Sequence, residues 1–350
     1  MLYLRSNFRW TRNNISLTTG MLNNALPKLV NLRSVHLSAT SDGVGSVLRT
    51  LQVTCPRLRG LSIKYVKYLA WKLSKTDFFF RSSDAPIDLS FLEFKHLAHF
   101  SYVMTSPSTA SPAKVHALLS QNKTTLRTLS LESQSIHPSP HWTFPTGTAS
   151  SSAILSIRNL TTITFTGHFA ATTQAFAEIL SHGRQLENLT LQCSALDTNN
   201  ASNQFRSVLA QNAALGNMNT NILPFLRHFA FVVLSVGRRM VDRDLFPSIA
   251  EFLRGRRSMK TLQLVAHDEI EQHATGFDAS IWGVLPSLDG LKGLWMTYPG
   301  DLSPGLASWL IPRGLKSLRL ELGREGGGEG FLNVCAMFRP SFLLSSHSFI

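Results

Sequence analysis

Two short stretches hold residue types that could do chemistry. The first is HDEIEQH, residues 267–273, in which His267 and Glu271, and likewise Glu269 and His273, stand four residues apart. On a helix this spacing would put each pair on one face and offer two edges for a metal ion. The order is not H-E-x-x-H, and the stretch comes directly after an expected strand. We therefore interpret it as a solvated polar loop.

The second stretch is GREGGGEG, residues 323–330, which follows an expected strand and precedes an apolar segment. That is where a phosphate-binding loop would stand, but no glycines match G-x-G-x-x-G and no G-K-[ST] follows. We interpret it as a flexible break. The twelve histidines and many serines include no G-x-S-x-G elbow. We expect no catalytic, cofactor-binding or metal-binding residues, and no enzyme activity.

The charge balance permits an acidic partner. The 350-residue chain is 43% hydrophobic, enough for a sizeable core, and carries a formal net charge of +13. Such a charge would suit nucleic acid or an acidic protein. The tight clusters are few, at Arg238–Arg239 and at Arg254, Arg256 and Arg257. We therefore favour basic residues spread over a solvated surface.

Three distant cysteines, Cys55, Cys193 and Cys335, form no C-x-x-C pair. They favour a reducing compartment, so we expect a cytoplasmic or nuclear location. No apolar run approaches 18 residues, and the arginine-interrupted N-terminus has no signal-peptide core, so we expect no membrane segment. The triplet Asn122-Lys123-Thr124 is interpreted as a chance match to a glycosylation site.

A leucine phrase recurs along the chain. L-x-x-L-x-L stands at Leu126, Leu129 and Leu131, and related phrases occur ten times, 24 to 40 residues apart. Ten copies at such spacing are typical of a solenoid. The ten copies begin at Leu32, Leu58, Leu97, Leu126, Leu160, Leu186, Leu226, Met259, Leu291 and Leu315.

The segments between the phrases repeat as well. Several carry apolar residues at helical spacing, as at Val47, Leu48 and Leu51, and the last helical leucine precedes the next phrase by six or seven residues. This join predicts one unit used repeatedly: a short parallel strand, a loop, an outer helix and a tight return.

The sequence resembles leucine-rich repeat proteins, specifically the long, irregular repeats of F-box/LRR proteins that are abundant in fungi. The phrase TCPRLRGLSI, with Cys55-Pro56 leading into Leu58, is similar to the C-P-x-L-x-x-L join of those repeats. The resemblance implies an α/β solenoid, a right-handed horseshoe-like arc of about ten repeats. Its parallel sheet would be concave and its helices convex. We expect a lead-in or cap at 1–21, the repeat domain at 22–322, and a Gly-rich break with an apolar tail at 323–350.

The chain departs from the family pattern in three ways. Most repeats lack the consensus Asn or Cys after the third leucine, which leaves the curvature open. Polar or aromatic insertions are expected at 66–91, 134–152, 195–204 and 215–224. No F-box phrase precedes the first repeat, since Leu26-Pro27 leads straight into a strand. The tail at 323–350 either caps the solenoid or is an unnatural end.

Most phrases carry a cation after their first apolar residue, at Arg33, Arg59, Arg127, Arg227, Lys260, Lys292 and Lys316. Repetition would line these cations up along one sheet edge. They could form a track for an acidic partner or nucleic acid, although we favour solvated rim charges, because stacking aromatics are not interleaved.

Strand alternation puts the leucine-type anchors in the core and the intervening residues on the concave face. There we expect partner-binding residues among Lys64, His228, Gln263, Trp295 and Arg319. Trp295 is either the main anchor or is covered by the C-terminal segment. We expect a monomeric, non-catalytic protein-interaction scaffold, the substrate-recognition part of an SCF-type ubiquitin ligase. A Skp1-like adaptor would bind only through an F-box outside this chain. The alternative is a nucleic-acid- or acidic-protein-associated scaffold that uses the basic edge.

Overall fold

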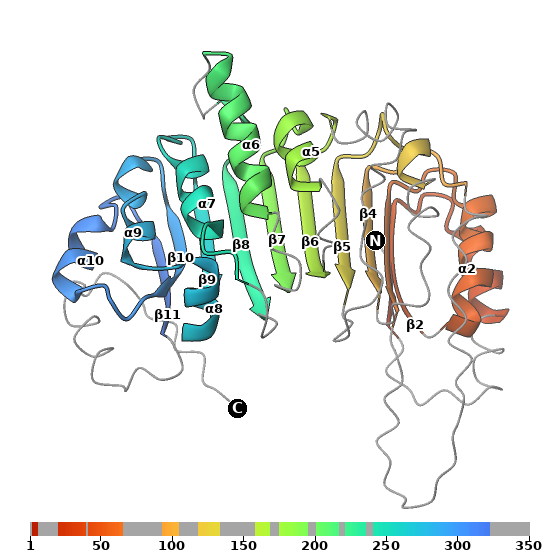
Figure 1. Ribbon diagram of the computed structural model, residues 1–350. Coiled ribbons are helices and arrows are strands. Elements are labelled where there is room, and N and C mark those ends of the chain that lie inside the picture. Colours follow the sequence, from red (N-terminus) through yellow and green to blue (C-terminus); the bar gives the residue numbers. More distant parts are fainter. Residues whose placement is uncertain are drawn as a thin grey trace, which may run out of the picture. The chain divides into compact units, whose positions relative to one another are not determined.

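The computed structural model describes residues 2–5, 20–39, 41–65, 93–104, 118–133, 158–168, 175–194, 201–216, 221–235 and 241–322. The chain divides into two compact units, Met1–Leu160 (unit 1) and Thr161–Ile350 (unit 2). Figure 1 labels most of the elements of both units. The predicted insertions at 66–91 and 134–152, the arginine pair at 238–239 and the tail at 323–350 lie outside the described residues.

Unit 1 contains five described strands that pair in chain order, and every recorded pair is parallel. The strands are β1 (Leu2–Arg5), β2 (Ser34–Ala39), β3 (Gly60–Tyr65), β4 (His99–Met104) and β5 (Thr128–Ser133). A short 3-10 helix, η1 (Leu26–Lys28), leads into β2, and the helix α2 (Ser41–Thr54) connects β2 to β3.

Unit 2 contains six described strands, and its recorded pairs are again parallel and sequential. The strands are β6 (Thr162–His168), β7 (Asn188–Ser194), β8 (His228–Ser235), β9 (Thr261–Ala266), β10 (Gly293–Tyr298) and β11 (Ser317–Leu322). The connections contain α5 (Ala175–His182), α6 (Ala201–Ala214), α7 (Leu245–Leu253), α8 (Glu269–Thr275), α9 (Ala279–Trp282), η4 (Leu285–Ser287) and α10 (Pro304–Leu310). The chain is therefore an α/β protein with parallel strands.

All ten leucine phrases form strands, and the anchors of the first nine point into the core as predicted. In the opening phrase, for example, Leu126, Leu129 and Leu131 are buried. The sequence did not predict the strand β1. It lies within the expected lead-in at 1–21 and pairs with β2. The last strand also differs from the prediction, because its anchors Leu318 and Leu320 are only half-buried. The expected domain boundaries at 21/22 and 322/323 stay predictions.

In unit 2 the helices cover the anchor face of the strands through aromatic contacts. Phe229 and Phe231 on β8 meet Phe252 and Phe246 on α7, with ring centroids 5.7 Å and 5.9 Å apart. Phe252 also lies 5.6 Å from Phe205 on α6. Figure 1 shows α6 and α7 side by side over this part of the sheet. These tilted and edge-on pairs stabilise the packing beyond what the burial of the rings contributes.

The cation before each strand has a structural role at several repeats. Arg59 donates through Nη1 to the carbonyl of His96 at 2.9 Å, and Arg127 donates to the carbonyl of Asn159 at 3.2 Å. Lys292 reaches the carbonyl of Gly314 at 3.4 Å. Each cation therefore binds the turn of the following repeat, which supports the solvated-rim interpretation at these positions.

Asn122 fixes the turn before β5. It is 1% exposed, and its Nδ2 donates to the carbonyls of Phe94 and Leu118 at 2.7 and 2.9 Å. Its Oδ1 accepts the N–H of Leu97 at 2.8 Å. A buried amide with three partners is part of the fold.

Three helices and one arginine depart from the sequence interpretation. The predicted polar insertion at 195–204 overlaps the start of α6, and neither α8 nor α10 was predicted. Arg256 was assigned to a surface cluster but is 2% exposed. It donates to the carbonyls of Phe252, Leu223 and Ile222 at 2.6–3.2 Å, and burial lowers the pKa of its guanidinium to about 9.

Candidate functional site

The outward-facing residues of the strands line up in register, as predicted. In unit 2 each central residue pairs with the central residue of the next strand. This column reads Thr164, Thr190, Ala230, Gln263, Trp295 and Arg319. In unit 1 the corresponding column reads His36, Ser62, Ser101 and Ser130.

A groove of about 560 Å³ lies over the last strands of unit 2. It brings together four of the five predicted site residues, His228, Gln263, Trp295 and Arg319. The other groove residues are Thr190, Phe229, Ala230, Thr261, Leu262, Gly293, Leu294, Lys316, Ser317 and Leu318. The fifth predicted residue, Lys64, is exposed on β3 in unit 1 and does not line this groove.

Trp295 is the large aromatic side chain of the groove, and it is held in place on two sides. The guanidinium carbon of Arg319 lies 3.8 Å from the centre of its ring. Its indole N–H donates to Oε1 of Glu321 at 3.0 Å. A stacked arginine and a hydrogen-bonded edge fix the plane of the ring, so Trp295 is a half-buried, pre-oriented platform.

Glu321 connects the groove to the end of β9. Its Oε1 also lies 3.4 Å from Nη2 of Arg319, and its Oε2 lies 2.9 Å from Nδ1 of His267. The hydrogen bond with His267 is the main cause that lowers the pKa of Glu321, against the opposing effect of burial. Sequence reasoning did not select Glu321 or His267 for the site. Glu321 had a usable signal, since it stands two residues after Arg319 on the same strand face.

The groove also contains polar side chains beside its apolar ones. Nδ1 of His228 lies 2.8 Å from Oγ1 of Thr261 on the neighbouring strand. On the next strand, Gly293 is closely packed between its neighbours: a Cβ there would crowd Oγ of Ser317 at 3.0 Å and Cγ2 of Thr261 at 3.2 Å. Hydroxyl, imidazole and guanidinium groups therefore line the groove beside its apolar residues, which suits hydrogen bonding to a bound chain.

Strand alternation predicts that the residue two places after each central residue also faces outward. On β8–β10 these residues, Val232, Val265 and Thr297, are buried instead. Oγ1 of Thr297 accepts the N–H of Ala266 and donates to its carbonyl, both at 3.0 Å. Thr297 therefore acts as part of the strand pairing, and the groove stops short of it.

A row of cations borders the groove where β8–β11 begin. Arg227, Lys260, Lys292 and Lys316, called the basic row below, each precede their strand by one residue. The backbone N–H of each later member donates to the carbonyl of the previous one, at 2.6, 2.8 and 2.7 Å. The four residues therefore stand at one level, on strands about 4.8 Å apart.

The stretch His267–His273 is not the loop that the sequence predicted. Residues 269–275 form α8, and Asp268 caps it by accepting the N–H of Glu271 at 2.7 Å. The Glu271 carboxylate accepts the N–H of His267 at 2.7 Å. Asp268 and Glu271 together therefore cap the N-terminus of α8. Within the described ranges, no three His, Cys, Asp or Glu side chains gather closely enough to hold a metal ion.

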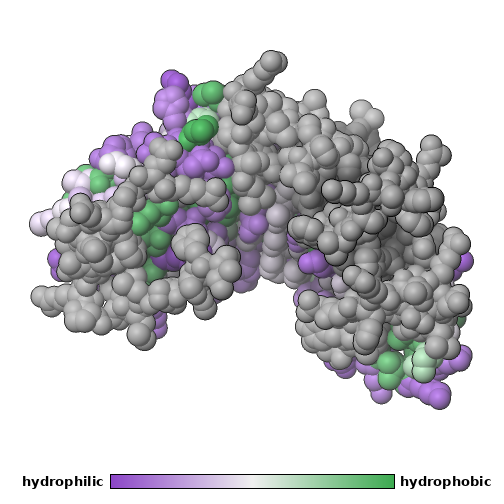
Figure 2. Space-filling model, turned by 90° about the horizontal axis from the view of Figure 1, so that it is seen from below, coloured by the Kyte–Doolittle hydropathy of each residue, from purple (hydrophilic) through white to green (hydrophobic). Residues whose placement is uncertain are grey.

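Figure 2 shows the surface from below, with hydrophilic and hydrophobic residues intermixed over the described part of unit 2. In the part of the chain that the structure describes, no helix is both long enough and apolar enough to cross a membrane.

No protein-family model and no curated protein matches this chain.

Proposed function

We propose that the chain is a leucine-rich repeat protein of the F-box/LRR type that works as a non-catalytic protein-interaction scaffold. On this proposal its strands form the concave sheet of a right-handed solenoid, and its helices form the convex side. The repeated phrase, the sequential parallel pairing and the buried anchors of β2–β10 support it.

One observation carries the proposal: the groove in unit 2. It gathers Gln263, Trp295 and Arg319 from adjacent strands, at equivalent register positions. An oriented tryptophan beside an arginine is the kind of pair that contributes most of the binding energy at protein interfaces. The hydroxyl and imidazole groups around it can pair with the backbone of a bound segment.

On this proposal the chain is the substrate-recognition part of an SCF-type ubiquitin ligase. It would bind its target at the groove in the cytoplasm or nucleus. Contact with a Skp1-like adaptor is expected only where an F-box is present outside this chain.

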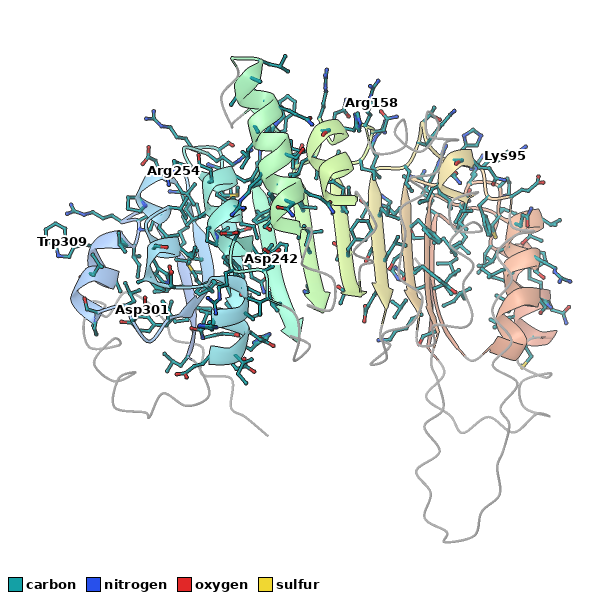
Figure 3. All side chains as sticks on the ribbon, viewed as in Figure 1. Lys95, Arg158, Asp242, Arg254, Asp301 and Trp309 are labelled. Atoms are coloured by element: carbon teal, nitrogen blue, oxygen red, sulfur yellow. The ribbon has the colours of Figure 1, made fainter. Side chains whose placement is uncertain are left out.

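The test is the selection of binders from a displayed library of proteome fragments, with the 350-residue chain immobilised. Trp295→Ala should weaken the selected binders at least tenfold. Trp309→Ala is the matched control, since Trp309 is 86% exposed and projects away from the sheet on α10 (Figure 3). Binders that tolerate Trp295→Ala and Arg319→Ala as well as they tolerate Trp309→Ala would refute the proposal.

The second candidate is a scaffold associated with nucleic acid or an acidic protein. The basic row favours it, because four cations at one level border the groove. A nucleic-acid partner would need exposed aromatic residues beside the row on which to stack its bases, whereas an acidic protein would not.

A further inference from the structure

We propose that the groove and the basic row together bind an extended acidic segment of a partner protein, which crosses β8–β11 in front of the strand starts. This inference rests on the proposed scaffold function and names the chemistry of the partner.

The first support is the uncompensated charge of the basic row. All four side chains are exposed, and among the described residues none of them makes an ion pair with a carboxylate. Three other cations of unit 2 are paired: Arg206 with Asp244, Arg254 with Glu251 and Arg257 with Asp289, at 2.7–3.5 Å. The basic row therefore offers positive charge to a partner that brings its own carboxylates.

The second support is that the row and the groove occupy the same strands. Lys316 itself lines the groove, and the residues directly after the row, His228, Thr261, Gly293 and Ser317, form its rim. At the same level, one residue before β7, stands Glu187, whose carbonyl accepts the N–H of Arg227 at 2.9 Å. The exposed carboxylate of Glu187 would repel an acidic segment there, so the segment would be confined to β8–β11.

The acid inside the site does not oppose this binding. Glu321 is already bound by Trp295, Arg319 and His267. Both of its carboxylate oxygens are occupied by residues of this chain, which leaves Lys316 to the partner.

The aromatic content favours a polypeptide over a nucleic acid. Single-stranded nucleic acids are held by aromatic side chains on which successive bases stack. Among the described groove residues, Trp295 is the large aromatic side chain that is not buried, and Arg319 already covers one face of it. A single half-covered ring can hold one apolar side chain of an acidic segment, but it does not provide stacking for successive bases.

The test compares two triple variants with equal charge change, using fluorescence anisotropy at about 150 mM salt. The row variant is Arg227→Gln, Lys260→Gln and Lys316→Gln, which leaves Lys292 and its contact with Gly314 intact. The control is Arg206→Gln, Arg243→Gln and Arg254→Gln, three exposed positions outside the row. Figure 3 shows Arg254 pointing away from the strands.

The probes are a labelled 12-residue glutamate-rich peptide with one central phenylalanine, its glutamine counterpart, and a 12-nucleotide oligouridylate. The wild-type chain should bind the glutamate peptide at least tenfold more tightly than the other two. The row variant should lose at least tenfold of that affinity, and the control variant less than twofold.

In this assay three results would overturn the inference: no preference for the glutamate peptide, equal losses in the two triple variants, or tighter binding of the oligouridylate. The proposed function fails separately, when library-selected binders ignore Trp295→Ala. If those binders need Trp295 but are not acidic, the scaffold proposal stands and this inference falls.

Discussion

At the scale of single residues, the described core is set by strand alternation. Leu129 is 1% exposed, while its neighbours Thr128 and Ser130 on the same strand are half-exposed. The leucine anchors therefore fill the core, and the residues between them are available to contact other molecules.

Leu129→Ala should destabilise the chain by about 2–5 kcal/mol, because it removes buried methyl groups and leaves a cavity. Ser130→Ala should change stability by no more than about 0.5 kcal/mol. Denaturant midpoints measure both. Similar losses for the two variants would mean that the strand faces are assigned the wrong way round.

Arg256→Met should destabilise by about 3 kcal/mol or more, because three buried carbonyls lose their donor. The neighbouring Arg257→Met is the matched control. Arg257 is exposed, its side chain lies 3.5 Å from Asp289, and its loss should cost less than about 1 kcal/mol. Urea unfolding at neutral pH separates the two. If both variants unfold at the same urea concentration, Arg256 is a surface cation after all.

At the scale of the element, the end of β10 depends on a side chain for its pairing with β9. Thr297→Val keeps the shape but removes the hydroxyl that binds the N–H and carbonyl of Ala266, so it should cost about 1–3 kcal/mol. Thr164→Val, on the half-exposed face of β6, should be nearly neutral. Thermal unfolding of the two variants provides the comparison, and a neutral Thr297→Val would contradict the proposed pairing role.

Glu321 links the end of β11 to His267 after β9, and this link predicts a pH dependence. The pKa of Glu321 is lower in the folded chain than in the unfolded one, so its carboxylate stabilises the fold at neutral pH. That contribution should be lost as the pH falls below about 4.3 and through the folded-state pKa. Glu321→Gln should therefore be less stable than the wild type at pH 7, with a difference that shrinks towards pH 3.

Stability curves from pH 7 to 3 test this link. Glu269→Gln, at an exposed position on α8, serves as the control and should stay within about 0.5 kcal/mol of the wild type. A difference between Glu321→Gln and the wild type that does not change with pH would argue against the ionic link.

The strands were more predictable than the helices. The leucine phrase fixes a strand and its register together, since a slip of one residue would expose every anchor. β1 was missed because LYLR lacks the earlier leucine of the phrase. α6 was missed because the asparagines at its start outweighed Phe205, Val208 and Leu209, which do have helical spacing. α10 had a readable signal in Ser303, which caps the helix by accepting the N–H of Leu306, with Pro304 next.

The site was predictable in position but not in detail. Alternation placed Gln263, Trp295 and Arg319 on one face, and the parallel register then made them neighbours. The stack of Arg319 on Trp295 and the contacts of Glu321 depend on side-chain rotamers, which no periodicity encodes. The burial of Thr297 was missed for the same reason, because it follows from a local bond to Ala266.

At the scale of the whole molecule, each described strand is held by its neighbours in the chain. Strands in the middle of unit 2 are buried by helices, whereas the anchors of β11 are half-exposed. Stability should therefore vary along the sheet rather than being uniform.

Amide hydrogen exchange should reveal this gradient. Amides of β8, above the buried Phe229 and Phe231, should exchange at least tenfold more slowly than those of β11 in the native state. Mass spectrometry of peptides covering 228–235 and 317–322 can measure both. Equal protection would show that unit 2 opens as one cooperative body.

The buried Asn122 has a consequence for any copy of the chain that is deliberately directed to the glycosylation enzymes. Its amide nitrogen already donates to Phe94 and Leu118, so an oligosaccharide could be attached only before this turn forms. Attachment would then prevent the turn from closing. A sugar on Asn122 would therefore identify molecules that reached the glycosylation enzymes before the turn had formed. The fraction of chain with reduced gel mobility would report how slowly unit 1 folds.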